Sequence, residues 1–163
     1  MKKGSYKIFL GLLAAAIFFL DFFTKRWIVY HVPLFPYGGI SVFENFFGVK
    51  FTIVHAINKG AAWGLFDSFP HLLLIVRFIL IGGLLAYLVL AKPQKRVEIP
   101  LVMCVAAAIG NITDFFLYGH VVDLFYFILW GYSFAIFNVA DSILCCSLIF
   151  LALTRRAHAP KHA

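Results

Sequence analysis

Residues 72–91 read LLLIVRFILIGGLLAYLVLA and contain one charged side chain, Arg77. A helix needs about 20 predominantly apolar residues to cross the hydrocarbon core of a bilayer, and this stretch has that length. Three further runs have the same character, at about 8–23, 99–117 and 134–153. We therefore expect an all-α membrane protein with four transmembrane helices.

The whole chain has the composition of an integral membrane protein. Of its 163 residues, 63% are hydrophobic and 13% are charged, and the mean hydropathy is +0.95. A soluble domain is nearer half apolar and a quarter charged. The net charge of +7 would suit nucleic-acid binding, but the basic residues lie in short clusters that flank the apolar runs. Membrane topology explains such clusters better, so we expect one membrane-embedded domain over 1–163 and no nucleic-acid partner.

The basic residues also predict the orientation of the spans. Three short segments would share one side of the membrane, and they contain Lys2, Lys3, Lys7, Lys92, Lys95, Arg96, Arg155, Arg156 and Lys161. Because short basic segments stay in the cytoplasm, both termini are expected there. The basic start followed by Ala14–Ala16 also resembles a cleavable signal peptide, but apolar sequence continues through Leu20. We expect an uncleaved span.

The loop at about 24–70 is predicted to lie outside the cytoplasm and to contain a small sheet. Prolines and glycines punctuate its first part. From Gly48 to His55 apolar and polar residues alternate, with Val49, Phe51 and Ile53 on one side. This alternation is typical of a strand. We expect the sheet to lie on the membrane surface with its apolar face toward lipid or the helices.

Ionisable residues at membrane depth are candidates for function, because burying a charge there is costly. Asp21 and Lys25 have the favourable order and spacing for a helical ion pair. They either close the outer end of the first span or place one partner against a substrate. Asn111 and Asp114 share one helical face, where such pairs usually hold helices together. Arg77, near the outer end of its span, is expected to extend to the membrane interface.

Two more aspartates, in GHVVD (119–123) and NVAD (138–141), flank the connection between the third and fourth spans. A hairpin there would bring Asp123 and Asp141 to similar depth. Two neighbouring carboxylates share a proton, so one can take a proton from water while the other donates to a carbonyl oxygen. That is the chemistry of aspartic proteases. Two other interpretations stay open, namely polar contacts between helices and a proton relay in a transporter.

Other catalytic motifs and metal sites are less well supported. No HExxH is present, and Ser133 in GYSFA lacks the last glycine of GxSxG. His120 and Asp123 are three apart but lack a full ligand set, and the three cysteines lack zinc-binding spacing. We expect no metal and no organic cofactor.

The segment NKGAAWG at 58–64 would let another backbone approach closely, because glycine and alanine have little or no side chain. Asn58 would then bond to an extended peptide. The alternative is an ordinary tight turn with an interfacial aromatic residue, Trp63.

Five motifs along the chain, taken together, resemble those of the lipoprotein signal peptidases, also called signal peptidase II. They are DFFTK at 21–25, NKGAAWG at 58–64, GNITD at 110–114, GHVVD at 119–123 and FNVAD at 137–141. Each motif is weak alone, but five in order cover nearly the whole chain. The family usually has Arg after the GNxxD aspartate and Gln after the first aspartate, where this chain has Phe115 and Phe22.

The resemblance implies a four-span aspartic endopeptidase of the bacterial inner membrane with a small extracytoplasmic β-cradle. It implies removal of signal peptides from prolipoproteins by a cut just before the cysteine that carries diacylglycerol, on the extracytoplasmic side. Asp123 and Asp141 would form the catalytic dyad. The residues that would bind substrate or support the site are Asn58, Gly60, Ala61, Trp63, Asn111, Asn138, Asp114, Asp21 and Lys25. The implied partners are the lipid-modified prolipoprotein and membrane lipids, and the cyclic peptide globomycin is expected to block the site.

Overall fold

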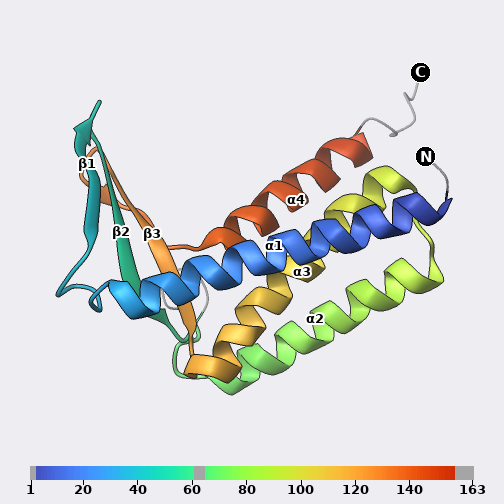
Figure 1. Ribbon diagram of the computed structural model, residues 1–163, viewed down its shortest axis with the longest axis horizontal. Helices are drawn as coiled ribbons and strands as arrows, with labels where there is room; N and C mark the ends of the chain where they lie inside the picture. The colour runs from blue at the N-terminus through green and yellow to red at the C-terminus, as the bar shows by residue number, and fades with distance from the viewer. Residues whose placement is uncertain (1–2, 61–64, 157–163) are drawn as a thin grey trace.

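The computed structural model describes residues 3–60 and 65–156, and these form a bundle of helices with a small sheet at one end (Figure 1). The helices are α1 (Lys3–His31), α2 (Pro70–Leu90), α3 (Lys95–Tyr118) and α4 (Val139–Arg156). The start of α1 and the end of α4 both lie at the end of the bundle opposite the sheet. The helices therefore separate the start of α1 and the end of α4 from the sheet.

Three of the helices, α1, α2 and α3, are long and apolar enough to cross a membrane. The apolar part of the fourth, Val139–Thr154, is shorter. The prediction of a helical membrane protein with a small sheet is thus confirmed at the level of three to four apolar helices. The predicted first span, 8–23, was too short, because α1 continues through the buried Lys25 to His31.

The centre of the bundle is α3, which packs against α1, α2 and α4. Small side chains fill the contact, since Ala106 and Ala107 of α3 and Ala140 of α4 are buried together with Ile17 of α1. Small residues are typical of helix contacts in membranes because they let backbones approach closely. This packing brings polar residues from three helices within hydrogen-bonding distance.

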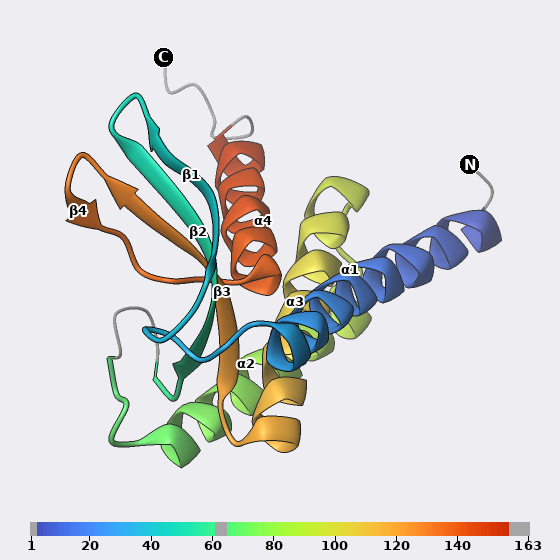
Figure 2. The same cartoon turned by 60° about the vertical axis from the view of Figure 1, so that its left-hand side comes forward.

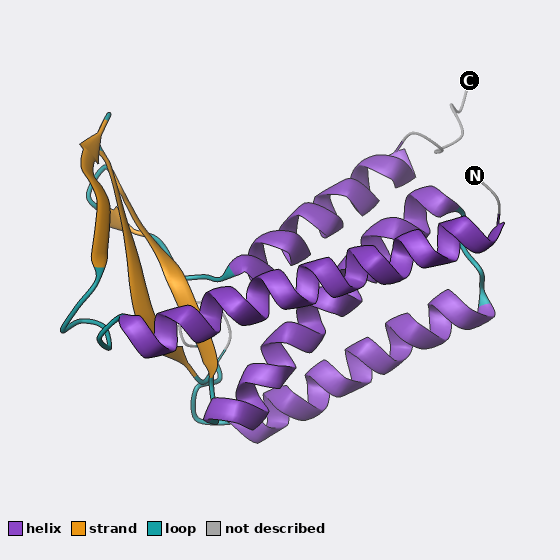
Figure 3. Ribbon diagram, in the orientation of Figure 1, coloured by secondary structure: helices purple, strands orange, loops and turns teal. Residues whose placement is uncertain are grey.

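The sheet is antiparallel, in the order β1 (Ile40–Phe46), β2 (Val49–Asn58), β3 (Val121–Leu129) and β4 (Tyr132–Ser133) (Figures 2 and 3). The strand expected after Gly48 is present as β2. The prediction of a sheet within 24–70 was right for β1 and β2 but incomplete, because β3 and β4 come from the connection between α3 and α4. Asn58 on β2 is the register partner of Val121 on β3. Such pairing between distant segments gives little local sequence signal.

The last helix begins later than the predicted residue 134. Phe137 is still paired with β3, where its carbonyl oxygen accepts hydrogen bonds from the backbone N–H groups of Leu124 (3.0 Å) and Phe125 (2.8 Å). The helix starts only after Asn138, so Asp141 lies in its first turn rather than deeper in the span. Asp123 lies on β3, and both aspartates are therefore near the junction of helices and sheet.

Candidate active site

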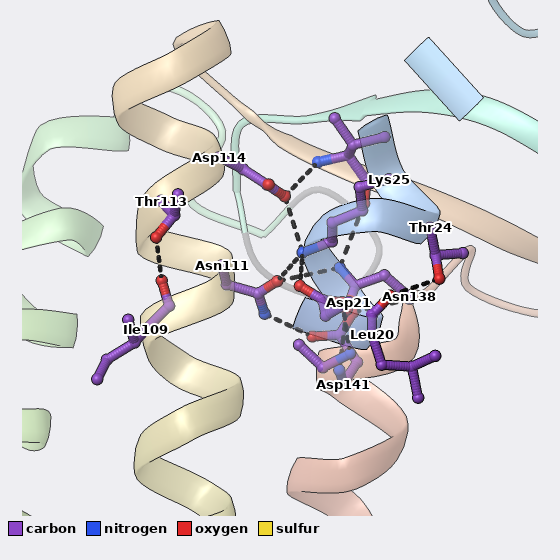
Figure 4. Close-up of polar contacts among 12 residues, drawn as sticks. Leu20, Asp21, Thr24, Lys25, Ile109, Asn111, Thr113, Asp114, Asn138 and Asp141 are labelled. Carbon is purple, nitrogen blue, oxygen red and sulfur yellow. Dashed lines mark hydrogen bonds and ion pairs between the residues drawn. The ribbon is translucent and has the colours of Figure 1, made fainter. Parts of the chain in front are cut away.

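A buried ion cluster joins α1 to α3. The ammonium of Lys25 lies 2.7 Å from Asp21 Oδ2 and 2.8 Å from Asp114 Oδ2, and it donates to Asn111 Oδ1 at 2.7 Å (Figure 4). Lys25, Asp21 and Asp114 are 1%, 0% and 2% exposed. The three donors of the ammonium match the three oxygens around it. The expected Asp21–Lys25 pair is present, and Asp114 joins it.

The two carboxylates of this cluster also hold the backbone beside the other two aspartates. Asp21 Oδ1 accepts from the N–H of Ala140 at 2.8 Å. Asp114 Oδ2 accepts from the N–H of Val122 at 3.2 Å. Since Ala140 precedes Asp141 and Val122 precedes Asp123, the ion cluster positions both chain segments that carry the candidate dyad.

Gly110 provides the space for this cluster. A Cβ added to Gly110 would lie 2.6 Å from Asp21 Oδ2. That oxygen cannot move away freely, because Lys25 holds it in a fully buried ion pair. Gly110→Ala is therefore expected to lower the free energy of unfolding by about 1–3 kcal/mol.

Thermal unfolding in detergent checks this prediction, with Gly82→Ala on α2 as the matched control. No atom lies within 4 Å of the Cβ that would be added at Gly82. The control should be neutral or slightly stabilising, since alanine is favoured over glycine in helices by roughly 0.5–1 kcal/mol. Equal stability changes in the two variants would contradict the role of Gly110.

Asp141 and Asn138 cap the start of α4 reciprocally. Asn138 Oδ1 accepts from the N–H of Asp141 at 2.9 Å, and Asp141 Oδ2 accepts from the N–H of Asn138 at 3.1 Å. This is a capping box made with Asn and Asp. The other oxygen, Asp141 Oδ1, accepts from Asn111 Nδ2 at 2.9 Å. Both carboxylate oxygens of Asp141 are therefore held by hydrogen bonds at the N-terminus of α4.

Asp123 is 2% exposed and is held by two asparagine amides. Asn138 Nδ2 donates to its Oδ1 and Asn58 Nδ2 donates to its Oδ2, both at 2.8 Å. Burial, and then the charge of Asp141, raise the pKa of Asp123 to about 7, although the two amide bonds act in the opposite direction. Asp123 therefore keeps a proton up to near-neutral pH.

Asn138 is the residue that links the two aspartates, because its side chain bonds to Asp123 and its backbone N–H bonds to Asp141. The structure thus brings Asp123 and Asp141 to one site, with Asn58, Asn111 and Asn138 in contact with them. The sequence predicted that Asn138 binds substrate or supports the site, without its contacts to the two aspartates. Its position three residues before Asp141, at the start of an apolar run, was a capping signal that could have located it.

Two other residues differ from expectation. Arg77 was expected at the membrane interface, but its half-buried guanidinium donates from Nη2 to the carbonyl oxygen of Gly60 at 3.0 Å. Phe115, where the resemblance suggested arginine, packs edge-on against His71 of α2 with ring centroids 5.9 Å apart. Of the remaining expected site residues, Gly60 is buried and bonded to Asn58, whereas Ala61 and Trp63 lie outside the described residues.

Metal binding has no support in the part of the chain that the structure describes, where no three His, Cys, Asp or Glu side chains gather as ligands. What the site does contain is two carboxylates with different environments. Asp123 is buried with a raised pKa, whereas Asp141 lies in the first turn of α4 and accepts two hydrogen bonds, one from the side chain of Asn111 and one from the backbone N–H of Asn138. Such a pair can hold one proton and exchange it with a bound substrate and water.

Known proteins are similar to this chain over most of its length. The sequence model of peptidase family A8, described as signal peptidase (SPase) II, matches residues 13–155. A lipoprotein signal peptidase of Chlamydia felis is 35% identical over 148 residues, which cover 86% of this chain and 88% of the relative. That of Geobacillus thermodenitrificans is 35% identical over 141 residues, covering 86% and 84%.

Solved structures agree with the sequence comparisons. A bacterial membrane enzyme determined by the in meso method at 2.3 Å resolution has a TM-score of 0.80 and 26% identity, covering 100% of this chain and 95% of that one. A second, determined at 1.9 Å, has a TM-score of 0.77 at 26% identity, covering 98% and 97%. Motifs, fold and relatives coincide, and this chain belongs to the signal peptidase II family.

Proposed function

We propose that this chain is an intramembrane aspartic endopeptidase that removes signal peptides from diacylglyceryl-modified prolipoproteins, cutting before the lipidated cysteine. The observation that carries the proposal is the contact of Asn138 with both Asp123 and Asp141. Membership of the family and the names of the relatives supply the substrate class.

The two aspartates would divide the acid and base roles according to their surroundings. Asp141 is the base, because its oxygens accept N–H groups at a helix start, and it takes a proton from the attacking water. Asp123 is the acid, because its raised pKa keeps a proton there for the carbonyl oxygen of the scissile bond. When the C–N bond breaks, Asp141 gives its proton to the leaving nitrogen and Asp123 recovers one from the tetrahedral hydroxyl.

The position of the site suits a substrate anchored in lipid. The dyad lies where the helices meet the sheet, at the end of the bundle away from the start of α1 and the end of α4 (Figure 1). With both termini in the cytoplasm, this end faces the extracytoplasmic side of the bacterial inner membrane. Lateral entry from the bilayer would then deliver the lipidated cysteine to the dyad.

The test is cleavage of a purified prolipoprotein, with and without its diacylglyceryl group, by the purified protein in detergent. We expect cleavage of the lipidated form alone, inhibition by globomycin, and a mature product whose first residue, by mass spectrometry, is the lipidated cysteine. Proton flux through liposomes without any cleavage would instead identify a transporter and overturn the proposal.

The raised pKa of Asp123 predicts how cleavage depends on pH. Asp123 holds the catalytic proton below about pH 7 and loses it above, so kcat/KM should fall as pH rises through about 7. Well above that value the loss approaches tenfold per pH unit, as for a single titrating acid. Initial rates measured from pH 5 to 9 check this. A rate that stays flat to pH 9 would contradict the role of Asp123 as the acid.

The same raised pKa has a consequence for stability. The folded protein binds a proton at Asp123 between its ordinary pKa of 3.8 and about 7, whereas the unfolded chain does not. The contribution of Asp123 to stability is thus most favourable below about pH 4 and is lost as pH rises to 7. Asp123→Asn should accordingly raise the melting temperature more at pH 8 than at pH 4.

A further inference from the structure

Arg77 has a position that the proposed mechanism does not use. It is the arginine of an otherwise strongly apolar helix, α2, where a charged side chain is expected to serve a purpose. Its guanidinium is half-buried and donates to the carbonyl oxygen of Gly60, which lies two residues after the end of β2. It also lies close enough to Asp141 and Asp123 to interact with their charges.

A chain of hydrogen bonds leads from Arg77 to the dyad. Arg77 Nη2 donates to Gly60 O at 3.0 Å, and the N–H of Gly60 donates to Asn58 Oδ1 at 2.9 Å. Asn58 Nδ2 then donates to Asp123 Oδ2 at 2.8 Å. Each link fixes the next, because an amide whose oxygen faces Gly60 must direct its nitrogen toward Asp123.

The weakest link in this chain is Gly60, since a glycine backbone has access to more conformations than any other residue. The other oxygen of Asp123 needs no such help, because Asn138 is fixed by the cap of α4 and by its bond to Asn111. The hydrogen bond from Arg77 to the carbonyl oxygen of Gly60 therefore restrains the contact to Asp123 Oδ2, which is the oxygen whose partner depends on a loop residue.

We propose that Arg77 is a positioning residue for the dyad, which holds Gly60 so that Asn58 orients the carboxyl group of Asp123. This role rests on the proposed peptidase function. Arg77 acts through Asn58 and does not itself need to touch the substrate. Arginine suits the task because its planar guanidinium donates in a fixed direction, which the flexible ammonium of lysine does less well.

The test is a double-mutant cycle on kcat and KM with the variants Arg77→Met, Asn58→Ala and both together. Misplacement of a catalytic group costs up to about 100-fold in rate, so Arg77→Met is expected to lower kcat by roughly 10- to 100-fold with KM within about twofold. The double variant should be no slower than Asn58→Ala alone, because both changes break the same chain. Arg77→Lys should recover part of the loss.

A pH profile separates positioning from general structural damage. The bond from Asn58 lowers the pKa of Asp123, so its loss should move the alkaline fall in kcat/KM of Arg77→Met to higher pH. The matched control is Arg26→Met on α1, whose guanidinium lies over the ring of Tyr30 rather than near the dyad. Its kcat and its pH profile should stay within about twofold of the wild type.

Several results would overturn the role of Arg77. For Arg77→Met, these results are an unchanged kcat, a rise in KM alone, or a lower kcat with no change in the pH profile. A further result is a double variant in which the losses in kcat from Arg77→Met and Asn58→Ala multiply. If Arg77→Met does not fold, the cycle of Arg77→Lys with Asn58→Ala decides by the same criterion. If Arg77→Met cleaves as fast as the wild type, the role of Arg77 is rejected but the proposed function stands. If Asp123→Asn cleaves the substrate, the proposed function itself is rejected.

Discussion

Replacing Asp123 or Asp141 by asparagine is expected to lower kcat for prolipoprotein cleavage by roughly 10³-fold or more, because each change removes an acid or a base from the reaction. The double variant should be no slower than the slower single variant, since residues that act as one unit have non-additive effects. A gel-shift assay with purified protein, in which the signal peptide is lost from the substrate, measures both results.

The variants should still fold, although the asparagine amide does not fit its new neighbours perfectly. Both oxygens of Asp123 accept from amide nitrogens, so at residue 123 an asparagine forces Asn58 or Asn138 to rotate. In Asp141→Asn the cap of α4 loses an acceptor, which costs about 1 kcal/mol. The melting temperature of Asp141→Asn should therefore be slightly lower than that of the wild type. That of Asp123→Asn should be raised above pH 7, because the substitution removes an unfavourable buried charge.

Asp67→Asn is the matched control, because Asp67 is an exposed aspartate before α2 with no part in the described cluster. It should retain activity close to that of the wild type. Near-normal cleavage by either Asp123→Asn or Asp141→Asn would show that the dyad is wrongly assigned. Loss of cleavage in all three variants would point to the assay rather than to the dyad.

Lys25→Met is expected to lower the free energy of unfolding by about 3–5 kcal/mol, or to prevent accumulation of folded protein. The change leaves the carboxylates of Asp21 and Asp114 buried with no cation between them. It also removes one of the two donors to Asn111 Oδ1, and Asn111 in turn donates to Asp141. Denaturant or thermal unfolding in detergent micelles measures the loss.

The matched control for this prediction is Lys50→Met. Lys50 pairs with Glu44 at 2.6 Å, but the two side chains are 37% and 65% exposed. Exposed pairs contribute about 1 kcal/mol or less, so this variant should be nearly as stable as the wild type. A variant that combines Lys25→Met with Asp21→Asn and Asp114→Asn should regain much of the stability. Equal losses for Lys25→Met and Lys50→Met would refute the importance of burial.

The helices and the aspartates could be predicted from the sequence because their signals are local. Apolar runs located all four helices to within several residues, and the spacing of Asp21 and Lys25 predicted their ion pair. The motifs around Asp123 and Asp141 suggested that the two aspartates meet. Asp123 and Asp141 are only 18 positions apart, and this short separation can be read directly from the sequence.

The interactions that needed the structure connect segments far apart in the chain. Nothing in the pattern of β3 shows that Asp123 is the register partner of Ala56 on β2. The carboxylates of Asp21 and Asp114 bond to backbone N–H groups, and such partners leave no trace in residue identity. Arg77 was misjudged for the same reason, because its acceptor is the backbone oxygen of Gly60.

The pairing of β2 with β3 has a consequence for biosynthesis. A ribosome releases α1, β2 and α2 well before it reaches Asp123, and Asp141 follows only with the last helix. A nascent chain that has inserted α1 to α3 holds neither member of the dyad. On the proposed assignment of Asp123 and Asp141, the site is complete only after α4, the last helix in the chain, has been made and β3 has paired with β2.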